Sequence, residues 1–220
     1  MTFDHTLDLA GLQHLYLEPS ALVQSKKKPA LDAASTAFIA AAPFVLIGTS
    51  DASGRLDVSP RGGPCGFVQV LDDVRLAIGD LNGNNLLDSM RNIVETCRIG
   101  LLFVHPGKDE TLRVNGRACI TSDPRILDGF PSELARPKTA IGITIDEVFV
   151  HCAKAFRRGG VWDQTSWAAL ADQPDGVSIL VCQLAIDAEP DLLRARFETG
   201  YAADLAADRA DPVQNHRADI

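Results

Sequence analysis

The sequence predicts a small antiparallel β-barrel with helices at both ends, a mainly β fold of the α+β class. Between residues 44 and 150, short runs rich in β-branched and apolar residues follow one another at regular intervals, separated by turn signals such as DASG and GGPCG. The intervals are too short for the crossover helices of a doubly wound parallel sheet. Consecutive strands should therefore pair as hairpins, and their spacing favours a barrel over a sandwich.

Each expected element follows from a local pattern. An amphipathic repeat predicts a helix over 6–17, and an alanine-rich segment predicts another over 30–42. The basic run Lys26 to Lys28 between them is expected to be a solvated linker. Apolar runs between turn residues predict strands over 44–50, 55–61, 67–71, 74–80, 99–104, 111–121 and 140–150, and a helical repeat is expected over 85–97.

These elements divide the chain into three expected parts. Residues 1–43 form an N-terminal helical segment, and residues 44–162 form the barrel domain. Residues 163–220, which contain the helical patterns WAALADQ and PDLLRARFETGYAADLAAD, form a C-terminal extension that packs on the barrel.

Charge and composition limit the possible partners. The chain has 220 residues, 46% of them hydrophobic, which is enough to bury a sizeable core. Its formal charge of −8 repels phosphate backbones and anionic lipid surfaces, so any anion site has to be built locally. The N-terminus lacks the pattern of a signal peptide, and no stretch approaches the roughly 20 apolar residues of a membrane span. We expect neither a nucleic acid nor a membrane as partner.

The cysteines and the known catalytic motifs add further limits. Five cysteines are scattered along the chain without a C-x-x-C pair, so no metal site is expected, and the thiols are interpreted as small core residues of a protein in the reducing cytoplasm. Nucleophile-elbow, phosphate-loop and zinc-protease motifs do not occur in the sequence.

The stretch DVSPRG, residues 57–62, is the first candidate binding element. Because side chains alternate along a strand, Leu56 and Val58 should lie on one face, and the other face should carry Arg55, Asp57, Ser59 and Arg61. A hydroxyl and a guanidinium at a strand end can hold a phosphate, since the arginine fork matches phosphate oxygens. The alternative is a surface arginine paired with Asp57 or another acid.

A loop and the helix after it form the second candidate. The loop from Asp80 to Asn84 accepts left-handed conformations, and Asn84 or Asn85 should be the N-cap of the helix. Asn85, Ser89 and Asn92 then form a polar stripe near the helix N-terminus, where unpaired N–H groups favour an anion. A capped helix with an ordinary polar face is the alternative. The core face of this helix is expected to comprise Leu86, Met90, Ile93 and Cys97.

Two further polar groups lie downstream. Arg113, Asn115 and Arg117 share one face of a strand, for which plain solvent exposure is the alternative. After the last strand come the residues of HCAKAFRRGGVW, whose cations and indole could shape a pocket for an anionic or aromatic ligand. The candidates for this substrate pocket are His151, Lys154, Arg158 and Trp162.

Seven motifs occur in one order along the chain: S-P-R-G, G-F-V-Q-V-L-D-D, G-N-N, D-S-M-R-N-I, R-I-G-L-L-F, L-R-V-N-G-R-A and H-C-A-K-A. Their order resembles that of the FMN-binding split-barrel flavoproteins, the pyridoxamine 5'-phosphate oxidase-like superfamily, and within it a poorly characterised FMN-dependent branch. The likeness covers about residues 44–162. It implies an antiparallel split β-barrel, a homodimer with FMN at its interface, and an FMN-dependent oxidoreductase.

The resemblance also implies site residues. Ser59 and Arg61 would hold the phosphate and ribityl region of FMN, and Asn84, Asn85 and Ser89 would complete the phosphate site. Arg113, His151 or Arg158 would approach the flavin from the partner subunit. The full set of cofactor contacts expected on this basis is Ser59, Arg61, Asp80, Asn84, Asn85, Ser89, Asn92 and Arg113.

The chain departs from its relatives at two points. Many relatives carry arginine or lysine where this chain has Asn84 and Asn85, so phosphate binding should depend more on Arg61, Ser89 and the helix N–H groups. The segment FRRGGVW replaces the R-L-H-D-R-like end of true pyridoxamine phosphate oxidases, which argues against vitamin B6 oxidation.

Several alternatives stay open at this stage. A nicotinamide nucleotide or a small organic molecule is the expected reaction partner. A flavin-binding or sensory module without turnover is the second hypothesis, and a split barrel that binds heme or another cofactor is the third. The C-terminal extension would cover the flavin site or enlarge the dimer.

Overall fold

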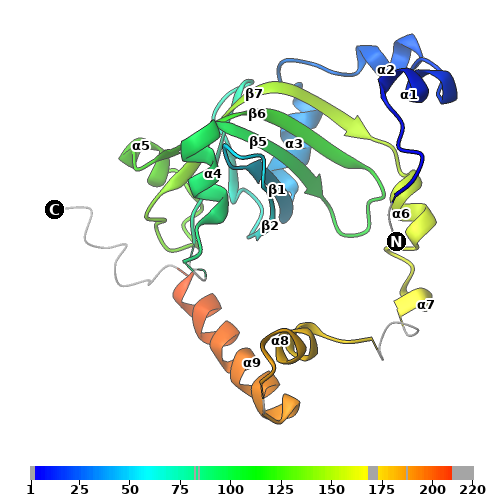
Figure 1. The fold of residues 1–220 in the computed structure, drawn as a ribbon. Helices are drawn as coiled ribbons and strands as arrows, with labels where there is room; N and C mark the ends of the chain where they lie inside the picture. The colour runs from blue at the N-terminus through cyan, green and yellow to red at the C-terminus, as the bar shows by residue number, and fades with distance from the viewer. Residues whose placement is uncertain (1–2, 82, 84, 168–172, 187, 210–220) are drawn as a thin grey trace.

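The computed structural model describes residues 3–81, 83, 85–167, 173–186 and 188–209. In this part of the chain, seven strands form one antiparallel sheet in the order β2-β1-β5-β6-β7-β4-β3 (Figure 1). The strands are β1 (Phe44–Ser50), β2 (Leu56–Gly62), β3 (Val68–Val70), β4 (Arg75–Gly79), β5 (Arg98–Val104), β6 (Thr111–Thr121) and β7 (Ala140–His151). The predicted antiparallel β fold with flanking helices is confirmed, and every predicted strand is present with its ends shifted by at most one residue.

Helices lie before, within and after the sheet (Figure 1). They are α1 (Leu9–Leu15), α2 (Ala21–Ser25), α3 (Ala33–Ala41), α4 (Asp88–Thr96), α5 (Pro124–Leu127), α6 (Lys154–Gly159), α7 (Gln164–Trp167), α8 (Gly176–Leu184) and α9 (Pro190–Ala207). The helix expected over 6–17 is shorter, because the Asp8 carboxylate accepts a hydrogen bond from the Gly11 N–H and so caps α1 at Leu9. The separate helix α2 was not predicted.

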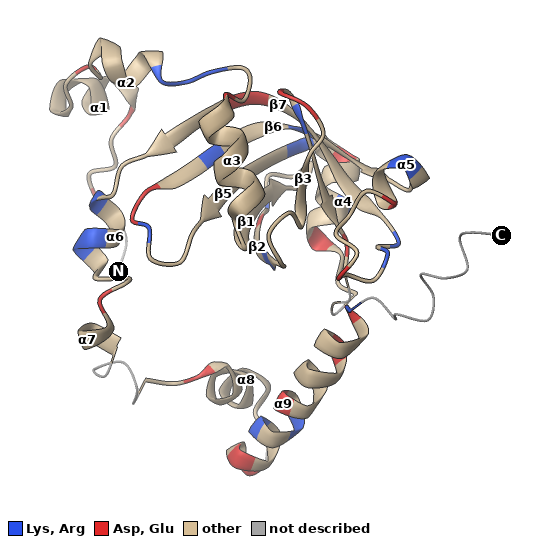
Figure 2. Ribbon diagram, turned by 180° about the vertical axis from the view of Figure 1, so that it is seen from behind, with Lys and Arg blue, Asp and Glu red and all other residues tan. Residues whose placement is uncertain are grey.

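The sheet curls around one hydrophobic core. Val45 and Ile47 of β1 are fully buried and alternate with half-buried residues, as a strand with one face on a core requires. Ile39 of α3 and Ile93 of α4 belong to the same core. Both helices lie against the sheet (Figure 2). Helix α3, expected in a separate N-terminal segment, therefore contributes to the barrel core. The domain boundaries after residues 43 and 162 stay predictions.

A bulge in the longest hairpin brings two strands unusually close. The register between β6 and β7 shifts between Asn115 and Gly116. A Cβ atom at Gly116 would lie 2.2 Å from the carbonyl oxygen of Thr144, closer than any real contact. Only glycine fits there, since backbone and not a movable side chain fills the space.

The thiols occupy other places than the sequence suggested. The prediction that they are core residues is wrong, because Cys65, Cys97, Cys119, Cys152 and Cys182 are all free and exposed. Strand alternation gives the physical reason at one of them: Ala118 faces the core and is buried, so its neighbour Cys119 faces outward.

Membrane-spanning helices and clusters of metal ligands are both absent from the described residues. No helix there is both long enough and apolar enough to cross a membrane. No three His, Cys, Asp or Glu side chains of this part of the chain come together as metal ligands would.

Candidate functional site

A cavity of about 490 Å³ opens between strand β2, the end of β4 and the start of α4. Binding cavities of proteins typically measure about 300–1,000 Å³. The described residues that line it are Asp57, Ser59, Pro60, Arg61, Gly62, Phe67, Ile78, Gly79, Asp80, Leu81, Gly83, Asn85, Leu86, Leu87, Asp88, Ser89, Met90 and Asp208.

Strand β2 turns its polar side toward this cavity. Asp57, Ser59 and Arg61 are half-buried, whereas Leu56 and Val58 on the other face are 83% and 69% exposed. The Arg61 guanidinium donates hydrogen bonds to the Ser59 hydroxyl at 2.5 Å and to the carbonyl oxygen of Pro60 at 3.0 Å. The two residues are thus neighbours, as strand alternation predicted. The alternative pairing of Arg61 with Asp57 is not formed, because Asp57 is engaged elsewhere.

Helix α4 starts at the cavity, but three residues later than predicted. Its N-cap residue is Leu87, which has a left-handed backbone (φ 60°), so the prediction of an asparagine N-cap at residue 85 is wrong. A leucine side chain cannot accept a hydrogen bond, so the first-turn N–H groups lack a capping acceptor at that position. Asn85 lies in the preceding loop, also with positive φ (59°), and Asn84 lies outside the described residues.

The later start also changes which residues of α4 are buried. Leu86 precedes the helix and is 59% exposed, and Cys97 is exposed at its end, so the predicted core face is wrong at both positions. Ile93 is buried as predicted, and Ser89 is buried beside it. The Ser89 hydroxyl donates a hydrogen bond to the Asp57 carboxylate at 2.5 Å.

Asn92 does not reach the cavity. Its side-chain amide donates to the Thr49 hydroxyl of β1 at 3.0 Å, which fastens α4 to the sheet. The structure therefore brings together Ser59, Arg61, Asp80, Asn85 and Ser89 of the expected cofactor contacts, and it leaves Asn92 and Arg113 outside the cavity lining.

The cavity is rich in negative charge. Asp57, Asp80, Asp88 and Asp208 line it, and Arg61 is the one cation among the described lining residues. Burial raises the pKa of Asp80, although the charges of Arg61 and Lys138 act against this. The guanidinium of Arg61 therefore shares the cavity lining with the carboxyl groups of four aspartates.

A second group of polar residues lies on the outer face of strands β6 and β7. The side chains of Lys26, Lys27 and Arg113 all stand over the ring of Phe149, with distances of 5.2–5.5 Å from the cationic groups to the ring centroid. The ring of His151 lies 4.9 Å from the same ring. We call Lys26, Lys27, Arg113 and His151 the basic cluster.

Two lysines of the basic cluster have polar partners among the described residues. Lys27 forms an ion pair of 2.9 Å with Glu147, and the Lys26 ammonium donates to the carbonyl oxygen of Val150 at 2.9 Å. Burial, together with the charges of Arg113 and Lys26, lowers the pKa of His151 and so favours the neutral ring. Its Nε2 atom is buried and has no hydrogen-bond partner among the described residues.

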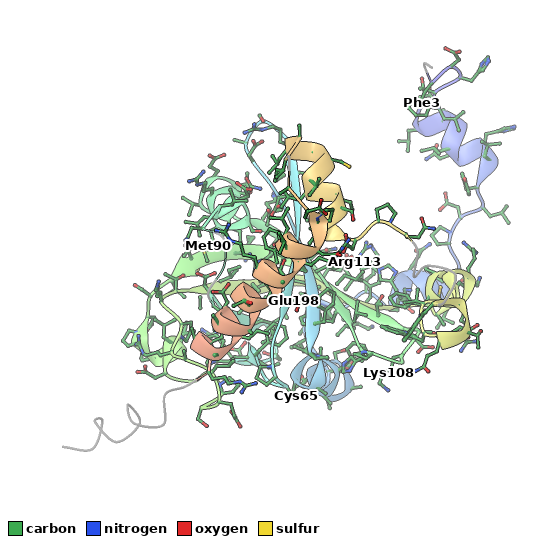
Figure 3. The ribbon with its side chains drawn as sticks, turned by 90° about the horizontal axis from the view of Figure 1, so that it is seen from below. Phe3, Cys65, Met90, Lys108, Arg113 and Glu198 are labelled. Carbon is green, nitrogen blue, oxygen red and sulfur yellow. The ribbon has the colours of Figure 1, made fainter. Side chains whose placement is uncertain are left out.

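The remaining candidates for a substrate pocket lie in and after α6. Lys154 and Arg158 are exposed there, and the Trp162 indole N–H donates to the carbonyl oxygen of Lys108 at 2.7 Å. None of them, nor His151, lines the cavity beside β2. In Figure 3, Met90 at the cavity and Arg113 in the basic cluster lie on separate parts of the molecule.

Residues 31–152 match a family model described as "Pyridoxamine 5'-phosphate oxidase". The chain belongs to the pyridoxamine 5'-phosphate oxidase family. The match starts at the approach to α3 and ends after β7, so it contains both the cavity walls from β2, β4 and α4 and the outer face that carries Arg113. The resemblance inferred from the motifs is confirmed. The helices α6 to α9 lie outside the matched residues.

The chain is also similar to solved structures. HupZ of Group A Streptococcus is 17% identical, with 55% of this chain and 93% of that chain covered and a TM-score of 0.44. General stress protein 26 of Bacillus anthracis is 15% identical, with 52% and 88% covered and a TM-score of 0.40. An F420 reductase is 16% identical, with 51% and 93% covered and a TM-score of 0.34. No curated protein matches the chain.

The cavity of this family member suits FMN in part. Its volume, the Arg61 guanidinium and the start of α4 fit a ligand that ends in a phosphate. The side chains of Asp57, Asp80 and Asp88 are acidic. Among the described lining residues of a single chain, Arg61 is therefore the one cation that can balance the dianionic phosphate of FMN. The described lining residues therefore fit the group in cavity volume and in one phosphate-binding side chain, but their net charge does not match a dianion.

Several residues of both groups cannot be found from the sequence patterns alone. Asp57 shares a strand face with Ser59 and Arg61 as predicted, but its place in the cavity lining was not predicted. The expected solvated linker is in fact attached to the barrel, since Lys28 forms a β-bridge with Val148. No local signal in the sequence points to Asp208, because it lies far along the chain from the rest of the cavity.

Proposed function

We propose that the protein is an FMN-dependent oxidoreductase whose flavin binds in the cavity between β2 and α4. The observation that carries the proposal is the meeting of Arg61, Ser59 and the start of α4 at one cavity of suitable volume. Membership of the pyridoxamine 5'-phosphate oxidase family supports it, since flavin binding is common there.

The residues of this chain would have distinct tasks. Arg61 donates hydrogen bonds to the phosphate, and Ser59 holds the guanidinium in place. The first-turn N–H groups of α4 point the positive end of the helix dipole at the same phosphate. The hydrogen bond from Ser89 to Asp57 keeps α4 at a fixed distance from β2. When bound, the flavin itself supplies the hydride or electron transfer.

The missing positive charge is best supplied by a second copy. The cavity lining is acidic, whereas among the described residues the basic cluster on the β6–β7 face forms one ion pair, between Lys27 and Glu147. In a homodimer with two-fold symmetry, each copy can bring Arg113 and His151 to the flavin site of the other.

The reaction partner would be a nicotinamide nucleotide or a small organic molecule that stacks on the flavin. Lys154 and Arg158 are exposed cations close in sequence to His151 and would attract an anionic partner of this kind. The five free thiols suit the reducing cytoplasm.

The test is anaerobic mixing of the FMN-loaded protein with NADH or NADPH, followed by visible absorption. An oxidoreductase of this kind loses the flavin band near-stoichiometrically and regains it on exposure to oxygen. If FMN binds but no nicotinamide or small organic reductant bleaches it, the protein is a flavin-binding module without turnover. If FMN does not bind and a Soret band appears with heme, the proposal is overturned in favour of a heme-binding split barrel.

A further inference from the structure

The chain beyond the family match forms a segment that leaves the barrel and comes back to it. We call residues 163–209 the strap. Just before it, the Arg157 guanidinium forms an ion pair of 2.8 Å with Asp109, and Trp162 donates to the backbone of Lys108. These contacts fix the beginning of the strap at the turn between β5 and β6.

The end of the strap is attached at the cavity. The N–H of Ala135 donates to the carbonyl oxygen of Asp208 at 2.8 Å, and Arg209 forms an antiparallel bridge with Leu134. Asp208 follows α9 directly and lines the cavity. Between its two attachments, α8 and α9 stand away from the sheet (Figure 1), and neither buries a residue.

Helix α9 carries an apolar stripe that the described part of its own chain covers only in part. Leu193, Phe197, Tyr201 and Leu205 follow one another at intervals of four residues and so lie on one side of the helix. Helix α8 packs beside the first half, where Leu193 and Phe197 are half-buried. Tyr201 and Leu205 in the second half are 57% and 63% exposed. The described residues thus leave two large apolar side chains in line without cover.

The opposite charges of the strap and of the basic cluster indicate which surface covers this stripe. The strap has nine Asp or Glu and three Arg, and its described ion pairs join Arg194 to Asp175 and Asp191 within the strap. The basic cluster of the same chain has the opposite charge and faces outward. Since every copy carries both surfaces, two copies can satisfy both contacts at once by two-fold symmetry.

We propose that the strap of one copy clasps a second copy, with the stripe at Tyr201 and Leu205 against the face that carries the second copy's basic cluster. The two residues lie on the last turns of α9, directly before Asp208, so a copy that reaches the cavity also contacts the stripe. The clasp builds on the proposed function, because it adds to the same dimer. It further couples assembly to the cavity, since the end of the strap is a cavity wall.

The test uses the full-length chain without flavin, studied by sedimentation over a range of protein concentrations. The variant carries Tyr201→Asp and Leu205→Asp together. Its control carries Thr199→Asp and Ala203→Asp, which place the same charges on the opposite side of the same exposed helix. Measuring without FMN keeps the result independent of flavin binding, which a separate FMN titration of the wild type reports.

We expect a wild-type dimer whose dissociation constant rises at least about tenfold in the Tyr201 and Leu205 variant, as loss of buried apolar area requires. The control should dimerise like the wild type, and Arg113→Gln or added salt should weaken the dimer as well. A wild-type monomer overturns the clasp. So does an unchanged dimer with a lowered melting temperature in the Tyr201 and Leu205 variant, because the stripe would then pack on its own barrel.

Discussion

The hydroxyl of Ser89 donates a 2.5 Å hydrogen bond to the carboxylate of Asp57, and this contact joins helix α4 to strand β2 across one end of the cavity. Ser89 is 3% exposed, so the bond forms away from water, where a hydrogen bond to a charged acceptor is strong. This pair of side chains, 32 residues apart in sequence, therefore helps to hold the two walls of the cavity together.

Replacing Ser89 with alanine should destabilise the fold. Ser89→Ala removes the donor and leaves the half-buried Asp57 carboxylate without this partner, which costs about 1–3 kcal/mol. Urea unfolding followed by circular dichroism measures the change. Asp57→Asn is the comparison, because an amide oxygen can still accept from the hydroxyl; equal or larger loss in Asp57→Asn would contradict the assigned contact.

The bulge between β6 and β7 should not tolerate a side chain. Gly116→Ala places a Cβ against the carbonyl oxygen of Thr144 and should cost about 3 kcal/mol or more, since two backbones must move apart. Gly48→Ala is the matched control in the same sheet, because its Cβ would lie 3.8 Å from the nearest atom, and stability should change by less than about 1 kcal/mol. Thermal unfolding of both variants decides the matter, and equal melting temperatures would disprove the tight approach.

Burial of Asp80 should make stability depend on pH. Because burial raises its pKa in the folded state, the stabilising contribution of Asp80 is present below its ordinary pKa of 3.8 and is lost as the pH rises through the raised value. Asp80→Asn should therefore be more stable than the wild type at pH 7, and the difference should shrink as the pH falls toward 4. Urea unfolding at several pH values measures this. The exposed Asp73→Asn serves as control, and a constant difference across the range would refute the burial account.

Much of the sheet could be predicted because it follows local rules. The strand over 111–121 has its predicted ends and its predicted faces, with Leu112 and Val114 inside and Arg113 outside. Strand alternation also predicted that Ser59 and Arg61 would be neighbours. The two-residue alternation of side chains and the turn residues determine these features, and both are visible in short stretches of sequence.

The start of α4 could not be predicted in the same way. The asparagines at 84 and 85 are typical N-cap residues, yet the helix starts after Leu87, whose left-handed backbone no propensity rule favours. Tertiary contacts explain the outcome, since the start at Asp88 lets Ser89 reach Asp57 and Asn92 reach Thr49. Contacts between distant parts of the chain leave no periodic trace in a single sequence.

The basic cluster was hidden for the same reason. Lys26 and Lys27 look like a solvated linker, and only the folded chain brings them to the ring of Phe149, more than 120 residues later. Asp208 lines the cavity for the same reason, because only the folded chain brings it close to β2 and α4. Charged residues are common on surfaces, so the pattern alone could not distinguish these residues from their neighbours.

The most direct test of the central claim is titration of the protein with FMN and with riboflavin, followed by flavin fluorescence, for the wild type and Arg61→Ala. The two ligands differ only in the phosphate that Arg61 is assigned to hold. We predict that the wild type prefers FMN and that Arg61→Ala weakens FMN by about 10- to 100-fold through lost charge-assisted hydrogen bonds, while riboflavin binding hardly changes. Arg125→Ala, an exposed arginine paired with Asp123, should bind both ligands like the wild type. Equal binding of FMN and riboflavin by the wild type, or unchanged FMN binding in Arg61→Ala, would contradict the assignment of this cavity as the flavin phosphate site.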